Sequence, residues 1–177
     1  MTSPTSGAFR RGVRIGVDVG SVRVGVARTD PDGMLAVPVA TLTRPKAVAA
    51  ARSDLLALVD LVAEYDPLEV VVGLPLALDG TEGLASEAVR VYAADLRAAL
   101  SSRGLDVPIR LVDERLTTAS ATRGLQAAGR DARSGRAVID QAAAVIIVQH
   151  ALDTERSTGT PPGLLLEHET APREDRS

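Results

Sequence analysis

The chain has 177 residues, 45% of them hydrophobic, and a formal net charge of −3. This length supports one substantial hydrophobic core, so we expect a single domain. The acidic balance argues against a protein that coats nucleic acid nonspecifically, because such proteins are strongly basic overall. The absence of cysteine excludes thiolate nucleophiles, cysteine-ligated zinc, iron–sulfur clusters and disulfide scaffolds.

The two ends of the chain have the composition of segments outside the fold. Residues 1–12 are small, polar and basic, which predicts a flexible lead-in, and the domain is expected over residues 13–155. Residues 156–177 contain Pro161-Pro162-Gly163 and a charged end, so we interpret them as a disordered tail despite Leu164-Leu165-Leu166. No signal peptide is indicated, and no apolar run reaches the roughly 20 residues of a membrane-spanning helix. We therefore expect a cytoplasmic protein with no membrane partner.

Three strands and a helix are predicted in the first part of the domain. The alternating, β-branched sequence from Arg14 to Asp30 predicts two strands joined by a tight turn at Gly20-Ser21-Val22. A third strand fits residues 36–42. Apolar residues recur at helical spacing over 47–64, which predicts a helix that Pro67 closes.

Helices and strands alternate in the second part. The apolar run at 69–73 predicts a strand covered on both faces. The order that follows is a helix at 86–102, a strand at 109–112, a helix from Thr117 or Thr118 to Ala128, a basic loop at 129–135 and a helix at 137–155. The order β-β-β-α-β-α-β-α-α predicts an α/β fold, a five-stranded mixed sheet with helices on both faces.

Asp18 is the first candidate for chemistry. Side chains alternate along a strand, so Asp18 shares its face with Gly16 and Gly20, and the space above the carboxylate is expected to be open. A cation or phosphate could then approach the backbone closely. The alternative is a turn residue, because Asp-x-Gly is common where hairpins reverse.

A second pair of acids, Asp113 and Glu114, directly follows the predicted strand at 109–112. Adjacent residues point to opposite faces, so only one of them can lie on the Asp18 side. We favour Glu114 because its longer side chain reaches past the strand end, while Asp113 would orient Arg115 or accept a hydrogen bond near the site. The alternative is a polar strand end that leads to a helix cap at Thr117.

Asp140 is the third candidate, because apolar residues surround it along the predicted helix at 137–155. A buried carboxylate without a partner costs several kcal/mol, and metal ligation is one arrangement that keeps it charged. An N-cap role is the alternative, although residues 137–139 already fit the helical pattern. Three carboxylates of this kind predict a site for Mg²⁺ or Mn²⁺ with Asp18, Glu114 and Asp140 as ligands.

Arginines supply the candidate contacts to substrate. Five of them lie between positions 115 and 136, where Asp131 is the one acid after Glu114. The planar guanidinium of arginine can bind two phosphate oxygens at once, so these residues could hold a nucleic-acid backbone. The alternative is a solvated face, because this chain uses arginine nearly everywhere. A glycine-rich loop at 73–83 offers either phosphate-binding amides or a structural turn. The candidate substrate-binding residues are Ser21, Arg115, Arg130, Arg133 and Arg136.

Four motifs in a fixed order resemble the YqgF family, also called RuvX, of Holliday-junction resolvases and pre-16S ribosomal RNA nucleases. The resemblance covers about residues 13–153. The motifs are Gly16-Val17-Asp18-Val19-Gly20, Val72-Gly73-Leu74-Pro75-Leu76 with Asp79-Gly80-Thr81-Glu82-Gly83, Asp113-Glu114-Arg115-Leu116-Thr117-Thr118, and Ile139-Asp140-Gln141-Ala142-Ala143-Ala144.

The resemblance implies a ribonuclease H-like fold and metal-dependent phosphodiester hydrolysis, with the family's acids at Asp18, Glu114 and Asp140. Compared with better-known members of that fold, the chain lacks an acid after the fourth strand, where Gly73-Leu74-Pro75 stands. The carboxylate after the fifth strand would substitute for it. The partner is then structured nucleic acid, either precursor ribosomal RNA or branched DNA, and symmetric resolution of a junction makes a homodimer one option.

Two other classes of function compete with a nuclease. The same fold could bind RNA or a transcription or ribosome-assembly factor without cutting, and a triple carboxylate mutant with full cellular function would favour that reading. Asp18-x-Gly20-Ser21 also resembles the phosphate loop of actin-like ATPases. Those enzymes need two such domains around a cleft, whereas this chain has length for one.

Overall fold

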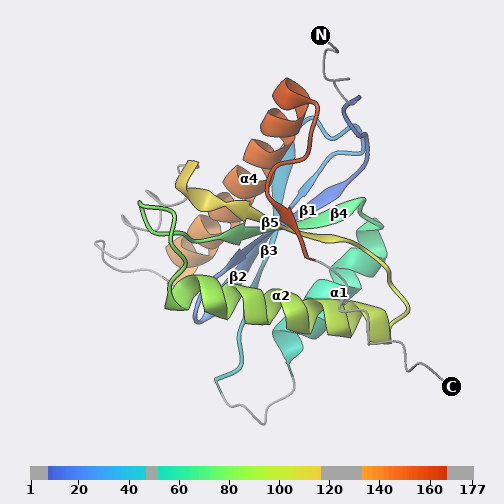
Figure 1. Ribbon diagram of the computed structural model, residues 1–177. Coiled ribbons are helices and arrows are strands. Elements are labelled where there is room, and N and C mark those ends of the chain that lie inside the picture. The colour runs from blue at the N-terminus through green and yellow to red at the C-terminus, as the bar shows by residue number, and fades with distance from the viewer. Residues whose placement is uncertain (1–7, 47–51, 117–132, 167–177) are drawn as a thin grey trace, which may run out of the picture.

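A six-stranded mixed sheet forms the centre of the computed structural model (Figure 1), which describes residues 8–46, 52–116 and 133–166. The predicted α/β class is confirmed, with one strand more than expected. The strands, in the spatial order β3-β2-β1-β4-β5-β6, are β3 (Ala36–Thr43), β2 (Arg23–Thr29), β1 (Arg14–Val19), β4 (Glu69–Leu74), β5 (Ile109–Asp113) and β6 (Leu164–Leu165).

The strand directions bring distant parts of the sequence to one end of the sheet. β1, β2 and β3 form an antiparallel meander, while β1, β4 and β5 run parallel. The carboxyl ends of β1 and β5 therefore lie at the same end of the sheet. We call it the carboxylate end, defined by Asp18 in β1 and Glu114 directly after β5.

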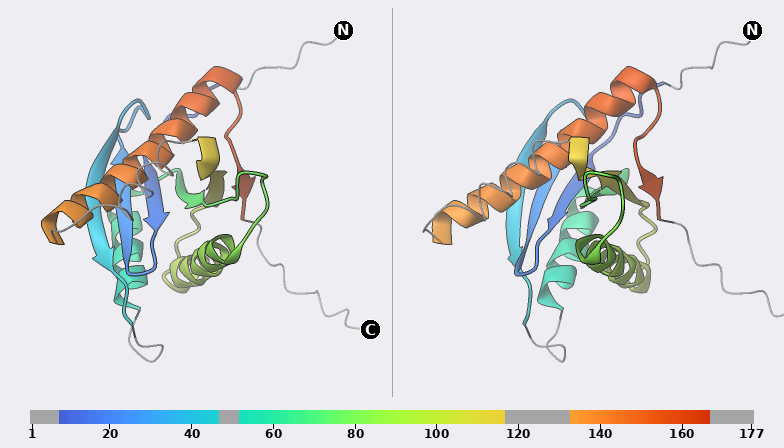
Figure 2. Two further views of the ribbon diagram at one scale, coloured as in Figure 1. Left: turned by 90° about the vertical axis from the view of Figure 1, so that its left-hand side faces the viewer. Right: turned by 60° about the vertical axis from the view of Figure 1, so that its left-hand side comes forward.

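Helices cover both faces of the sheet (Figures 1 and 2). Helices α1 (Ser53–Tyr65) and α2 (Leu84–Ser102) lie on one face, and α4 (Arg133–Thr158) lies across the other. A short 3₁₀ turn, η1 (Glu114–Leu116), follows β5. Among the described residues, no helix is both long enough and apolar enough to cross a bilayer.

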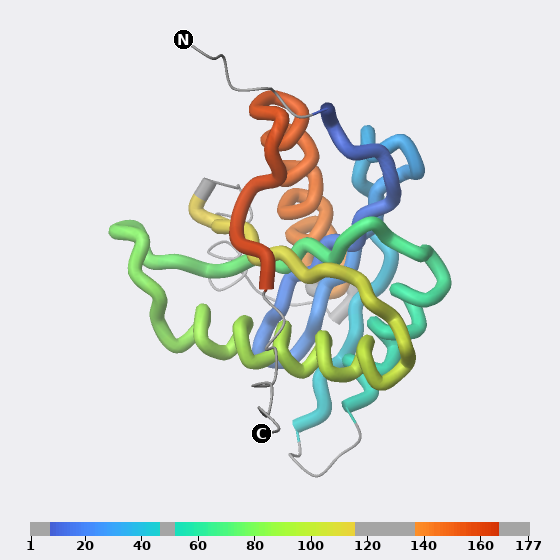
Figure 3. The backbone as a smooth tube through the Cα atoms, turned by 45° about the vertical axis from the view of Figure 1, so that its right-hand side comes forward, coloured from blue at the N-terminus to red at the C-terminus, as the bar shows by residue number. Residues whose placement is uncertain are grey.

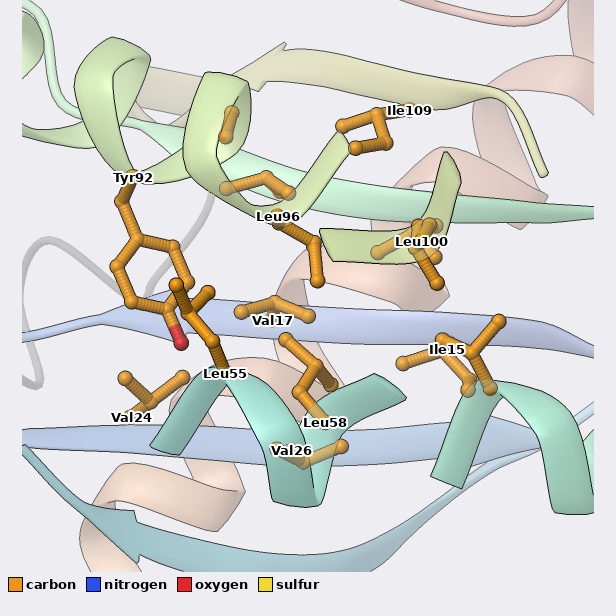
Figure 4. Close-up of a cluster of buried hydrophobic side chains, with 14 of the residues drawn as sticks. Ile15, Val17, Val24, Val26, Leu55, Leu58, Tyr92, Leu96, Leu100 and Ile109 are labelled. Atoms are coloured by element: carbon orange, nitrogen blue, oxygen red, sulfur yellow. The ribbon is translucent and has the colours of Figure 1, made fainter. Parts of the chain in front are cut away.

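The core is double, because strand residues alternate between the two faces. Ile15 and Val17 of β1 pack with Leu58 of α1 and Leu96 of α2 in the larger cluster (Figure 4). On the other face α4 brings small and branched residues to the sheet, among them Ile147. Asp18, next to Val17, thus points to the α4 side.

Helix α4 begins earlier and ends later than predicted. The sequence placed a helix at 137–155 after a basic loop at 129–135, but Arg133 already belongs to α4, which continues to Thr158. The loop prediction is wrong for residues 133–135, because the helical backbone continues through Gly135. The helix predicted from Thr117 or Thr118 lies outside the described residues.

The predicted lead-in is bound to the fold where it is described. Arg10 donates from Nε to Glu155 Oε1 at 2.8 Å and from Nη2 to Glu69 Oε1 at 2.8 Å, and Phe9 lies against the guanidinium of Arg14. Figure 3 shows this N-terminal stretch beside the end of α4. Ion pairs with distant acids thus attach Arg10 to the fold, within the segment for which the sequence predicts a flexible lead-in.

Part of the predicted disordered tail is also ordered. Leu164 and Leu165 form β6, which pairs antiparallel with β5 through Leu111 and Arg110 (Figure 3). The two residues become a strand because they pair with the edge of β5. Residues 167–177 lie outside the described part of the chain.

Candidate active site

Asp18 lies near the end of β1 and is 4% exposed. It pairs with Gly25 of β2, so it is a strand residue and not the turn residue of the alternative interpretation. The open space predicted over this face is partly filled, because a Cβ at Gly16 would lie 2.7 Å from the carbonyl oxygen of Ala144 in α4. Asp18 is consequently enclosed between the sheet and this helix.

The backbone of Asp140 lies on one side of Asp18. Asp140 belongs to α4, and a Cβ at Gly25 would stand only 2.0 Å from the Asp140 carbonyl oxygen. Glycine at position 25 is thus required for α4 to approach the sheet this closely. Because Gly25 is directly opposite Asp18 across β1 and β2, the helix delivers Asp140 next to Asp18.

The carboxylate of Glu114 lies on the other side of Asp18. The parallel pairing of Val17 with Val72 places Gly73 beside Asp18, on a strand about 4.8 Å away. A Cβ at Gly73 would stand 2.0 Å from Glu114 Oε1. Glu114 therefore fills the space that a side chain on the fourth strand would occupy, which is the position where the sequence lacks an acid.

Asp113 has a different role from that of its neighbour. Its carboxylate accepts from Arg115, with Nη2 to Oδ2 at 2.7 Å and the backbone N to Oδ1 at 2.9 Å. Arg115 also donates from Nη1 to the carbonyl oxygen of Leu78 at 3.3 Å. The expectation that Asp113 orients Arg115 is confirmed, and this pair ties η1 to the loop after β4.

Burial gives Glu114 a carboxyl group that holds its proton near neutrality. The residue is 2% exposed, and burial, followed by the charge of Asp113, raises the pKa of Glu114 to about 7. By contrast, the hydrogen bond from Arg115 lowers the pKa of Asp113. A cation beside Glu114 would favour its ionised form, so binding there would release a proton.

The side chain of Asp140 is bound to an arginine that sequence reasoning missed. Arg23 Nε lies 2.5 Å from Asp140 Oδ2, with 30% and 15% of the two side chains exposed. This ion pair gives the Asp140 carboxylate a cationic partner from β2. Asp140 stands seven residues after the start of α4 at Arg133, so the N-cap alternative is wrong.

The three predicted ligands differ in how well they fit a metal ion. Asp18 and Glu114 offer oxygen ligands, which Mg²⁺ and Mn²⁺ prefer, around the bare backbone of Gly73. Asp140 does not complete the set in this conformation because its carboxylate contacts Arg23. Within residues 8–46, 52–116 and 133–166, no three side chains of the Asp, Glu, His or Cys type lie close enough together to hold a metal.

The other predicted binding residues are Ser21, Arg130, Arg133 and Arg136. Ser21 is exposed in the turn that the hydrogen bond from Gly20 N to Arg23 O closes. Arg133 and Arg136 belong to the first turns of α4, whereas Arg130 lies outside the described residues.

The loop after β4 binds its own amide groups. Ala77 N donates to Thr81 O at 2.9 Å, and Thr81 N donates to Asp79 Oδ1 at 2.9 Å. These contacts favour a structural turn over a phosphate-binding loop.

Comparison with known proteins identifies the family. A family model described as "RuvX: Holliday junction resolvase" matches residues 12–154. A protein of Streptomyces coelicolor named "Putative pre-16S rRNA nuclease" is 53% identical over 155 residues, which are 88% of each chain. A relative of the same name from Nocardioides sp. is 53% identical over 163 residues, 90% of this chain and 99% of its own length.

Solved structures agree on the fold. Thermus thermophilus RuvC in complex with a Holliday junction substrate matches 86% of this chain and 99% of its own, with a TM-score of 0.53 and 16% identity. Another T. thermophilus RuvC structure has a TM-score of 0.50 at 19% identity. These matches confirm the predicted ribonuclease H-like fold. The family model and the relatives confirm the predicted nuclease: the chain belongs to the RuvX family of Holliday junction resolvases.

Proposed function

We propose that the chain is a cytoplasmic, divalent-metal-dependent endonuclease whose catalytic carboxylates are Asp18, Glu114 and Asp140. The observation that carries this proposal is the position of Glu114 Oε1 above Gly73, beside Asp18, with the Asp140 backbone over Gly25 on the other side. Two glycines thus make room, around one strand residue, for the carboxylate of Glu114 in η1 and for the backbone of Asp140 in α4. An arrangement built around a buried acid is costly for a fold and typical of a catalytic site.

The acids would hold Mg²⁺ or Mn²⁺, and the chemistry that such an ion would supply there is activation of a water and stabilisation of the leaving 3′ oxygen. Asp18 is fixed by its strand, and the proton held by Glu114 at neutral pH is released when positive charge arrives. Arg115 is held beside the site by Asp113 and would position the phosphate. Ser21 and the arginines at 130, 133 and 136 would extend the contact along the backbone.

The substrate is structured nucleic acid, either precursor 16S ribosomal RNA or a branched DNA junction. The relatives carry a name that refers to the first, and the family description refers to the second. The chain has 2% aromatic residues, too few to stack unpaired bases, so recognition would use backbone shape and charge. A homodimer would place two active sites on a symmetric junction.

Cleavage of purified four-way junctions and of precursor 16S ribosomal RNA in Mn²⁺ tests the proposal. Asp18→Asn should lower the cleavage rate more than about 100-fold, since even residues that only support a metal ligand are worth 10–100-fold. Asp60→Asn, which changes an acid paired with Arg103 on the surface, is the matched control and should cut normally. An Asp18→Asn protein that cuts as fast as wild type would refute the assignment.

A binding module without cleavage is the second candidate, favoured by the contact between Asp140 and Arg23. That contact removes one ligand from the metal set in the described conformation. This candidate predicts tight binding of precursor ribosomal RNA with no product in Mg²⁺ or Mn²⁺, and equal binding by the Asp18→Asn protein. Metal-dependent product from the wild type alone decides against it.

A further inference from the structure

The ion pair between Arg23 and Asp140 joins two parts of the candidate site. Arg23 is the first residue of β2, and Gly25, two residues later, lies under the Asp140 backbone. The guanidinium therefore reaches the Asp140 carboxylate from the strand next to Asp18. The 2.5 Å separation and the limited exposure of both side chains make this a strong, charge-assisted contact.

An arginine and a metal ion compete for the negative charge of one carboxylate, so the contact with Arg23 weakens Asp140 as a metal ligand. Asp140 Oδ2 accepts from Arg23 Nε, and this contact draws the carboxylate toward the start of β2. The backbone of Asp140 is already close to Asp18, because Gly25 admits it. Because no three acids of the described residues are grouped closely enough to hold a metal, we attribute the separation of Asp140 from the other two to its contact with Arg23.

We propose that Arg23 is a positioning residue that holds Asp140 away from the metal site and exchanges this carboxylate for a substrate phosphate. The inference rests on the proposed function. A divalent cation and Arg23 compete for Asp140, so the ion pair opposes metal binding when no nucleic acid is present. When a nucleic-acid phosphate lies at the site, the guanidinium gains a new anionic partner and Asp140 is released to the metal.

This exchange couples the two ligands. The phosphate strengthens metal binding, and the metal strengthens phosphate binding by the same factor. Full ligation then occurs only when substrate is in place. In the absence of nucleic acid the site is held in a form with two metal-binding acids instead of three.

Metal-induced thermal stabilisation tests the proposal without relying on cleavage. Wild type and the Arg23→Gln protein are titrated with Mn²⁺, and the melting temperature gives the half-saturating concentration. The Gln variant should need about 10-fold less Mn²⁺, the scale at which a ligand's hydrogen-bonding partner acts. The matched control is Arg11→Gln, which alters an exposed pair with Asp32 and should leave the titration unchanged.

A second arm adds a short duplex that lacks a junction as a source of backbone phosphates. It should lower the half-saturating Mn²⁺ concentration of the wild type and have little effect on the Gln variant. Arg23→Lys keeps the charge but loses the planar fork, so its Mn²⁺ requirement should lie between the two. This second variant also provides a test if Arg23→Gln folds poorly.

The outcomes separate the two claims. If wild type binds Mn²⁺ and the Gln variant needs the same or a higher concentration, Arg23 does not compete and the inference is wrong, while the proposed function stands. If wild type shows no Mn²⁺ stabilisation at any concentration, with or without the duplex, the proposed metal site fails and the inference fails with it. Cleavage by Arg23→Gln at saturating Mn²⁺ should be slower than wild type, because the phosphate contact is lost.

Discussion

The two ends of the same sheet treat buried charge in opposite ways. Where β1, β4 and β5 begin, arginines surround two buried glutamates: Glu69 accepts from Arg10, Arg14 and Arg110, and Glu155 accepts from Arg10 and Arg14. We call this the arginine-paired end. At the carboxylate end, Glu114 lies beside Asp18 and Asp113, and the charge of Asp113 opposes its ionisation.

The pKa values express the difference. Burial alone would raise the pKa of Glu155, but hydrogen bonds from Arg10 hold it below its usual range. For Glu114, burial and the charge of Asp113 both act upward, and together they raise its pKa to about 7. The comparison teaches that one end is arranged for stability, while the other keeps an acid in an unfavourable setting that a cation would relieve.

The largest expected effect is at the arginine-paired end. Glu69→Gln removes the acceptor shared by three arginines and leaves buried positive charge, so it should destabilise the fold by about 3–5 kcal/mol. A melting temperature lower by about 6–20 °C would be the measured result. Glu64→Gln, at an exposed position on α1, is the matched control and should change little. Equal melting temperatures for the two variants would remove the distinction between the ends.

Glu114→Gln should change stability in the opposite direction and stabilise the fold. The folded pKa is about 7 and the unfolded value is near 4.5, so the folded state binds the extra proton and loses stability as pH rises through this window. Gln cannot ionise, and above pH 7 without metal it should stabilise the protein by on the order of 2–3 kcal/mol. Melting temperatures from pH 4 to 8.5 in a chelator check this, and the gain should vanish near pH 4. A gain independent of pH would contradict the account.

Gly25→Ala tests the close approach that the carboxylate end requires. The new methyl group would meet the Asp140 carbonyl oxygen at 2.0 Å, so α4 must move from the sheet at a cost of about 1–3 kcal/mol. Urea unfolding gives that cost. Gly83→Ser is the control, because only chain neighbours lie within 4 Å of its Cβ position and serine is a favoured residue at the start of a helix such as α2. If the two variants were equally stable, the contact between α4 and β2 would not be as tight as described.

The smallest effect is expected for Asp113→Asn. Its pair with Arg115 is partly exposed, with side-chain exposures of 27% and 32%, so the loss should stay below about 1 kcal/mol. Mn²⁺ should still stabilise this variant, whereas it should not stabilise Glu114→Gln. Thermal titration of both proteins decides which of the two neighbouring acids binds metal. If Mn²⁺ no longer stabilised Asp113→Asn but still stabilised Glu114→Gln, the metal ligand would be Asp113.

The parts of the fold with local sequence signals were predictable. The alternation around Asp18 gave the hairpin, and the apolar run at 69–73 gave a strand covered on both faces. The same alternation predicted that only one of two adjacent acids would lie on the Asp18 side. The structure places Glu114 there, because its carboxylate stands over Gly73.

The parts that depend on distant partners were not predictable. Arg23 and Asp140 are 117 positions apart, and nothing in their own neighbourhoods indicates the contact. Arg10 lies in a segment with the composition of a flexible lead-in. Its contact could not be predicted because its partner Glu155 lies 145 positions away. β6 has only two residues and exists because β5 offers it an edge, so its strand character comes from pairing and not from its own sequence.

The ion pairs of Arg10 with Glu69 and Glu155 have a practical consequence for truncation. The family match starts at residue 12, and a domain cut at that boundary would lack the guanidinium that contacts both Glu69 and Glu155. The shortened polypeptide would keep every candidate catalytic side chain and yet melt earlier. A start site at or before Phe9 would preserve the ion pair between Arg10 and Glu155 of α4.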